Sequence, residues 1–425
     1  MSVIFYILIL YGFYLDFYFW RNITPLIISF SGVLIISLLY DLFGGLLGFI
    51  DVEPLIYLYI LTFFFCGLIA SILAAFITRK MTVNTSSDWV VIRNKIECSY
   101  KSINFFLFFT MIISIVCTVG IFVSYKSTGY FYGDDYERIL SQGIIGHSYA
   151  LLLSISPFLF IFSKQDSCSK FQRLSLKFLL VLILFLLFMK QVKYWVIVPM
   201  IWFFLINLYL YNKGILDFIK KSAVVLIAIL LLFFMVYFYK IIISSGDVDI
   251  ILAINQIANH FLGYLFSGLL VFSSMIRDGT FNSSISLDIF VIFNGGINFI
   301  STVIGQGLYH GKELIIPFYK LSSSGLTGNV GTIWATFLLY SGWYSFILFS
   351  AVIFLLSIFF CLAKRSFSFF ILYTCLSSFM ALCWFASYFA LLSSIEVPFL
   401  SLCICVFFAL FRNGKMNISK KTNKG

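Results

Sequence analysis

Apolar runs long enough to cross a lipid bilayer recur along the whole chain. An α-helix rises 1.5 Å per residue, so about 20 apolar residues cross about 30 Å of hydrocarbon. Hydrophobic residues make up 62% of the 425 positions and charged residues 11%, a balance that excludes a soluble domain. The runs are continuously apolar rather than alternating, which favours helices over a membrane barrel. The sequence predicts an all-α polytopic membrane protein with about 11–12 transmembrane helices.

One large loop separates two groups of predicted spans. The spans are expected at 2–19, 24–42, 55–78, 104–124, 144–163, 174–190, 194–211, 222–243, 344–362, 369–389 and 392–411. The predicted organisation is an N-terminal bundle over 1–243, the large loop over 244–343, C-terminal helices over 344–411 and a basic tail over 412–425. Inside the loop, the stretches 257–275 and 286–305 are amphipathic, re-entrant or membrane-crossing. Loops of this length build sites rather than only connecting helices.

Basic residues predict the orientation. One set of alternate loops, together with the C-terminal tail, carries 20 of the 28 lysines and arginines. The positive-inside rule places this set in the cytoplasm. The large loop and the N-terminus are then extracytoplasmic and the C-terminus is cytoplasmic. The net charge of +11 reflects this topology and contact with anionic lipid, so nucleic acid is not expected as a partner.

The cysteines argue against a disulfide framework or a metal site. None of the nine lies in a loop assigned to the outside. Their spacing matches no zinc motif, and nucleotide-binding and metalloprotease motifs are missing from the sequence. We therefore expect neither a cofactor nor a metal.

Three basic residues lie in loops predicted to face outward. Arg138 precedes the span 144–163, and Lys190 and Lys193 lie in a short turn between two spans. Cations contributed by different loops suit a phosphate or diphosphate ligand. The alternatives are an ion pair between Arg138 and a neighbouring carboxylate, and lysines that reach lipid headgroups.

Histidines in the large loop are candidate proton acceptors. His260 and Tyr264 are spaced i, i+4, which places them on one helix face and allows them to bind a sugar or orient a hydroxyl. His310 lies in a Gly-rich segment, and the sequence is equally consistent with an exposed base and with an ordinary loop residue at this position. The alternatives for the first pair are packing for His260 and a membrane-interface position for Tyr264. Arg277 either contacts substrate or pairs with Asp278.

Several short patterns resemble the O-antigen and oligosaccharide repeat-unit polymerases of the Wzy type. The resemblance covers the layout of most of the chain. It includes Arg138 before a Gly-containing helix start, the basic turn Lys190–Lys193, and a large outer loop that ends in Asn329-Val330-Gly331-Thr332. Relatives commonly carry Gly-Ser/Thr-Arg at the turn and Asp-Phe-Gly after the loop. This chain has lysines at the turn and Ser341-Gly342-Trp343 after the loop, so a role for that acid does not carry over.

The resemblance implies a metal-independent glycosyltransferase with a GT-C-like fold in the bacterial inner membrane. It would join undecaprenyl-diphosphate-linked oligosaccharide repeat units on the outer face, building O-antigen or capsule, with a chain-length regulator as a partner. Arg138 would act in catalysis and bind the diphosphate with Lys190 and Lys193. His260 or His310 would be the base, and Tyr264, Arg277 and Asn329 would contact substrate. A lipid-linked oligosaccharide flippase or transporter, and an O-antigen ligase, are the alternatives.

Overall fold

The protein is a mostly helical, multi-pass membrane protein. The computed structural model describes residues 2–78, 89, 92, 100–190, 194–211, 217, 220–221, 223–224, 227, 231, 234–235, 250–281, 291–304, 316–323 and 325–422. Within these residues, ten helices are long and apolar enough to cross a membrane. The chain divides into two compact units, which are described one at a time.

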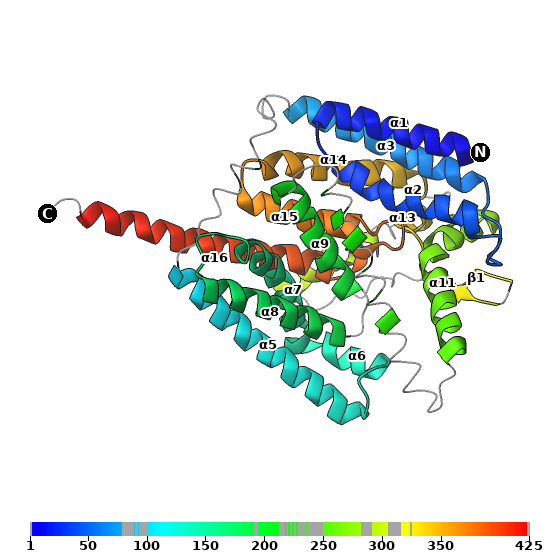
Figure 1. Ribbon diagram of the computed structural model, residues 1–425. Coiled ribbons are helices and arrows are strands. Elements are labelled where there is room, and N and C mark those ends of the chain that lie inside the picture. The colour runs from blue at the N-terminus through cyan, green and yellow to red at the C-terminus, as the bar shows by residue number, and fades with distance from the viewer. Residues whose placement is uncertain are drawn as a thin grey trace. The chain divides into compact units, whose positions relative to one another are not determined.

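The first unit comprises residues 1–85, 248–362 and 376–395. Its helices (Figure 1) are α1 Ser2–Trp20, α2 Pro25–Phe43, α3 Leu55–Thr78, α11 Ile250–Arg277, α12 Asn294–Ile304, α13 Ile333–Ser341 and α14 Ser345–Ala363, with the 3-10 turns η3 Gly342–Tyr344 and η4 Tyr388–Ala390. Two antiparallel strands of two residues each, β1 Tyr319–Lys320 and β2 Thr327–Gly328, form a hairpin in which Tyr319 pairs with Gly328.

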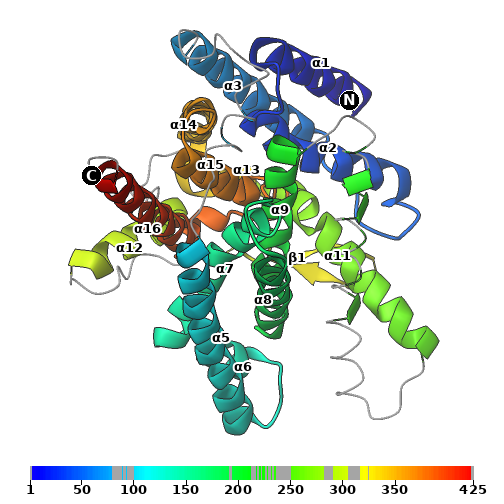
Figure 2. The same cartoon turned by 60° about the vertical axis from the view of Figure 1, so that its left-hand side comes forward.

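A buried carboxyl group joins the first three helices of this unit. Asp16 on α1 is fully buried and accepts hydrogen bonds from Thr24 Oγ1 and, at 2.6 Å, from Ser71 Oγ on α3. Trp20 Nε1 donates to the same Ser71 hydroxyl at 3.0 Å, and Thr24 also caps α2. In lipid, apolar burial does not drive helices together, so such interhelical polar contacts define which helices associate. Figures 1 and 2 show α1 and α3 side by side.

Aromatic side chains fill the core of the first unit. Phe30 on α2 packs against Trp334 on α13 and Phe349 on α14, with ring centroids 5.0 and 5.7 Å apart. Thr332 accepts a hydrogen bond from Ala335 N at 3.1 Å and so caps α13 directly after the Asn329–Thr332 segment. The outward side of α1 carries exposed apolar residues such as Ile4 and Tyr14, as expected for a lipid-facing surface.

The second unit comprises residues 86–247, 363–375 and 396–425. Its helices are α5 Tyr100–Thr128, α6 Asp134–Ser141, α7 Gly143–Phe162, α8 Lys170–Met189, α9 Tyr194–Tyr211, most of α16 Ser393–Thr422 and the first part of α15 Phe367–Met380. Helices α5, α7 and α8 pack together (Figure 2). Ser154 Oγ on α7 donates to Val397 O on α16 at 3.1 Å, which fixes these two helices.

Two boundaries differ from the sequence-based prediction. The span expected at 369–389 is helical as α15 and ends at Met380, because the chain then turns at 381–387. The undecided stretch 257–275 lies within one continuous helix, α11, whose segment Ile257–Arg277 is long enough to cross a membrane. The stretch 286–305 contains the short helix α12. Most of the predicted span 222–243 lies outside the described residues.

Candidate functional site

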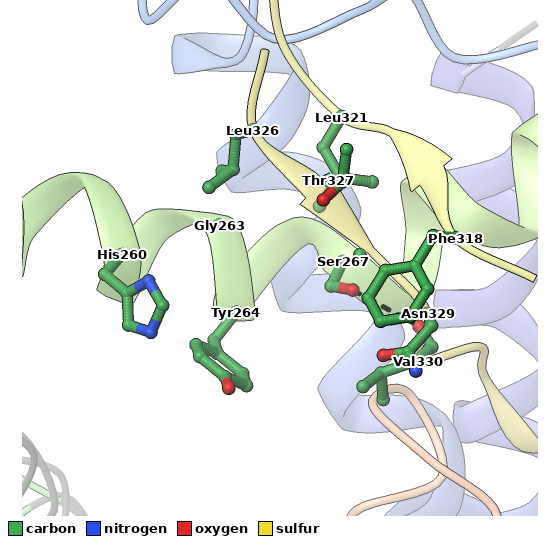
Figure 3. A pocket seen from close by; sticks show the side chains of 11 residues that line it. His260, Gly263, Tyr264, Ser267, Phe318, Leu321, Leu326, Thr327, Asn329 and Val330 are labelled. Carbon is green, nitrogen blue, oxygen red and sulfur yellow. Dashed lines mark hydrogen bonds between the residues drawn. The ribbon is translucent and has the colours of Figure 1, made fainter. Parts of the chain in front are cut away.

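A pocket in the first unit lies between α11 and the segment that carries the hairpin (Figure 3). Its volume is about 120 Å³. Helix α11 supplies His260, Gly263, Tyr264 and Ser267, which recur at helical spacing and so share one face. The opposite wall is formed by Phe318, Leu321, Leu326, Thr327, Gly328, Asn329 and Val330.

Both aromatic rings and short polar side chains line this pocket. The His260 and Tyr264 rings are 5.0 Å apart and nearly perpendicular, at 77°. The Tyr264 ring also lies 6.0 Å from that of Phe385. Rings of this kind cover an apolar face of a ligand, while an imidazole, a phenol and an amide can read its hydroxyl groups.

Close backbone contacts hold the two walls together. Ser267 Oγ donates to Val330 O at 3.3 Å, drawn as a dashed line in Figure 3. A Cβ atom on Gly263 would lie 2.5 Å from Leu326, and one on Gly328 would lie 2.7 Å from Ser267 Oγ. The glycines therefore let the hairpin segment lie directly against α11.

The structure brings Asn329 together with the His260–Tyr264 pair that the sequence analysis selected. His260 and Tyr264 share one face as their spacing predicted, and Asn329 joins them from a segment more than sixty residues further along the chain. Gly268, one turn after Tyr264, meets the backbone of the chain after α15, where an added Cβ would lie 2.2 Å from Trp384 O. The substrate roles of these residues stay predictions.

Arg277 lies at the end of α11, outside the residues that line the pocket. Its Nη2 donates to Asp51 O at 2.7 Å, and Ser273 Oγ on the same helix accepts from Glu53 N at 2.6 Å. These bonds attach the end of α11 to the turn between α2 and α3. Arg277 therefore has a structural contact in place of the suggested pairing with Asp278. The predicted residues His310 and Lys193 lie outside the described residues.

Lys190 in the second unit is buried among aromatic rings. The residue is 2% exposed, and its Nζ lies 3.8 Å from the centre of the Trp195 ring and 5.1 Å from that of Tyr149. Rings at this distance stabilise a cation through their electron-rich faces. The side chain therefore faces the interior of the unit rather than reaching lipid headgroups.

Burial changes the protonation of this lysine. It lowers the pKa of Lys190 to about 7, because an ammonium loses its hydration there. Negative charge on Glu396 and Glu137 acts in the opposite direction and favours the charged form. Near neutral pH the amine is thus poised between its two states, and an added negative charge nearby would favour protonation.

Arg138 forms an ion pair with a neighbouring carboxylate, which the sequence analysis gave as the alternative to binding a phosphate. Its Nη2 lies 2.9 Å from Asp135 Oδ1, one helical turn away on α6, and both side chains are about two-thirds exposed. Exposed pairs of this type are weak, about 0.2–1 kcal/mol, so the guanidinium can exchange this partner for a ligand. Tyr136 on the same helix donates to Met189 O at 3.0 Å and holds α6 against the end of α8.

A histidine–glutamate pair in the second unit escaped the sequence analysis. His147 Nδ1 on α7 lies 2.7 Å from Glu396 Oε1 on α16. The two residues are 249 positions apart, so no spacing pattern indicates the contact. The available signal was Glu396 itself, a carboxylate within a predicted span, where charged residues occur mainly with a partner. Among the described residues, no group of three or more His, Cys, Asp or Glu could hold a metal ion.

Comparison with known proteins identifies the family. A model for a family of unknown function (DUF6337) matches residues 45–415. No curated protein and no solved structure matches the chain. Because the family model covers most of the sequence, the chain belongs to the DUF6337 family.

Proposed function

We propose that the protein is a glycosyltransferase that joins lipid-linked oligosaccharide repeat units into a longer polysaccharide. The donor and acceptor are undecaprenyl-diphosphate-linked oligosaccharides on the extracytoplasmic face of the bacterial inner membrane, and the product is O-antigen or capsule. The observation that carries the proposal is the pocket in which His260, Tyr264 and Asn329 come together beside membrane-length helices. An amphipathic, aromatic site on such a helix suits a sugar attached to a lipid.

The reaction needs a cation for the departing diphosphate. The acceptor hydroxyl attacks the anomeric carbon of the donor sugar, a new C–O bond forms, and the bond to the lipid diphosphate breaks with its electron pair leaving on the phosphate oxygen. Lys190 is buried, so it acts on this anion through its charge rather than by contact, and a nearby negative charge favours its ammonium form over the neutral amine. Arg138 contributes a second cation after leaving Asp135.

The test is the identity of the lipid-linked intermediate after gene deletion. Mass spectrometry of extracted lipids should show single repeat units on the lipid carrier and no long polymer on the cell surface. Unligated polymer on the carrier would indicate a ligase instead, and single repeats confined to the cytoplasmic leaflet would indicate a flippase. Unchanged lipids and unchanged surface polysaccharide would refute the proposal.

Complementation then ties the activity to the pocket. A Tyr264→Ala variant loses the ring that contacts His260 and should restore little or no polymer, whereas Tyr264→Phe keeps the ring and should restore more. Tyr14→Ala is the matched control, because Tyr14 is 63% exposed on α1 of the same unit. Full chain length with Tyr264→Ala would remove this pocket from the site.

A further inference from the structure

We propose that His147, oriented by Glu396, is the base that accepts the proton of the acceptor sugar hydroxyl. The inference rests on the proposed glycosyl transfer and assigns a step that had been given to His260 or His310. Its basis is the position and orientation of an imidazole relative to a shielded carboxylate, both in the second unit.

The hydrogen bond between the two residues defines which nitrogen can act. The Glu396 side chain is 12% exposed, while that of His147 is 60% exposed. A carboxylate accepts hydrogen bonds, so the proposed base is the tautomer whose proton is on Nδ1, 2.7 Å from Glu396 Oε1. Nε2 then carries the lone pair, on a side chain that is 60% exposed. The same relation between carboxylate and imidazole orients the general base of serine hydrolases.

The pair is held in a rigid frame. His147 is the fifth residue of α7, and Glu396 lies in the first turn of α16. Two helical turns further along α7, the Ser154 hydroxyl binds Val397 O, so the two helices are fixed where they carry the pair. A base supported in this way keeps its direction when substrate arrives.

The same region holds the buried lysine. Tyr149, two residues after His147, contributes one of the two rings around Lys190 Nζ. Glu396 is close enough to Lys190 for its charge to favour the ammonium form of that side chain. A proton acceptor and a cation for the leaving diphosphate thus belong to one unit. The His260 ring belongs to the first unit, where it packs edge-on against Tyr264.

The proposed step balances without a metal or a redox partner. The acceptor oxygen bonds to the anomeric carbon while its proton moves to His147 Nε2. The carbon–oxygen bond to the lipid diphosphate breaks, and the diphosphate leaves with the electron pair. The imidazolium, stabilised by the Glu396 carboxylate, then returns its proton to solvent. General base catalysis of this kind contributes about 10²–10⁴-fold to a rate.

The decisive variant is His147→Asn, assayed in the purified full-length protein in proteoliposomes. The substrate is the lipid-linked oligosaccharide extracted from the deletion strain. The asparagine amide still reaches Glu396 as a donor but has no basic nitrogen, so we expect a loss of at least about 10²-fold in rate. In His147→Ala, added imidazole should restore part of the rate. Ile144→Ala, on the same turn and 80% exposed, is the control for folding and insertion.

Glu396→Gln tests the positioning role. We expect this variant to have a lower kcat with little change in KM. Because both residues act through one imidazole, the double variant Glu396→Gln/His147→Asn should lose no more activity than His147→Asn alone. Wild-type elongation together with an active His147→Asn protein would overturn the assignment of the base and leave the proposed function intact. A wild-type protein that elongates nothing would overturn both.

Discussion

Replacing Lys190 by methionine should change how the stability of the protein depends on pH. Lys190 is 2% exposed, and burial lowers its pKa from 10.5 to about 7. Between these two values the unfolded chain binds a proton that the folded protein does not, so wild-type stability rises with pH across this window. Below about pH 7 both states bind the proton, and the folded protein carries the whole cost of the buried charge.

The size of the effect follows from the two pKa values. At about 1.4 kcal/mol per pKa unit, the cost of the buried lysine is about 5 kcal/mol at low pH. Roughly 3 kcal/mol of this disappears between pH 6 and pH 9, because the unfolded chain gains less from its proton as the pH rises. Methionine has no titratable group and fills a similar volume between Trp195 and Tyr149, so Lys190→Met lacks this dependence.

Thermal unfolding of the detergent-purified proteins measures the difference. The Tm of the wild type minus the Tm of Lys190→Met should increase by on the order of 5 °C from pH 6 to pH 9, scaled from soluble domains. The neighbouring acidic groups Cys117, Glu137 and Glu396 are common to both proteins and largely cancel in this comparison. Lys126→Met, on the exposed last turn of α5, should follow the wild type. A Tm difference between wild type and Lys190→Met that stays constant with pH would refute the reasoning.

Two substitution pairs in the first unit test its packing. Gly295→Ala places a Cβ 2.2 Å from Leu391 O and should lower the free energy of unfolding by about 1–3 kcal/mol. In the adjacent Gly296→Ala the new Cβ lies 3.7 Å from Ile395, so this variant should be as stable as the wild type or slightly more stable. Equal Tm values for the two variants would contradict the observed contact of α12 with η4. Asp16→Ala removes the acceptor of Thr24 and Ser71 and should cost about 2–3 kcal/mol, with a smaller loss for Asp16→Asn; a wild-type Tm for Asp16→Ala would show that this network does not join the helices.

Helices were predicted most accurately where the backbone must satisfy its own hydrogen bonds in lipid. Continuous apolar runs predicted helices such as α3 and α7 nearly to the residue, because a spanning backbone has few alternatives to a helix. Prediction was weaker for α11, where His260 interrupts the apolar pattern, and for the end of α15, where the apolar sequence continues through the turn at 381–387. Composition alone does not distinguish a helix from a buried turn.

Only the part of the candidate site that depends on local spacing could be predicted from the sequence. The i, i+4 spacing of His260 and Tyr264 is local, so it could be read from the sequence and places both residues on one wall of the pocket. The contact of His147 with Glu396 and the ring enclosure of Lys190 depend on tertiary packing between helices. Neither leaves a periodic signal, and burial, which determines the properties of Lys190, cannot be read from a short basic turn.

The proposed chemistry requires the ends of the second-unit helices that carry His147 and Lys190 to face away from the cytoplasm. Ser141 and Ser167 are exposed positions just before and just after α7, so they lie at its opposite ends. In intact spheroplasts, a membrane-impermeant maleimide should label Ser141→Cys above the wild-type background and should label Ser167→Cys only after the membrane is opened. Labelling of Ser167→Cys in intact spheroplasts, with Ser141→Cys protected until lysis, would place the site in the cytoplasm and contradict an extracytoplasmic transfer from a lipid-linked donor.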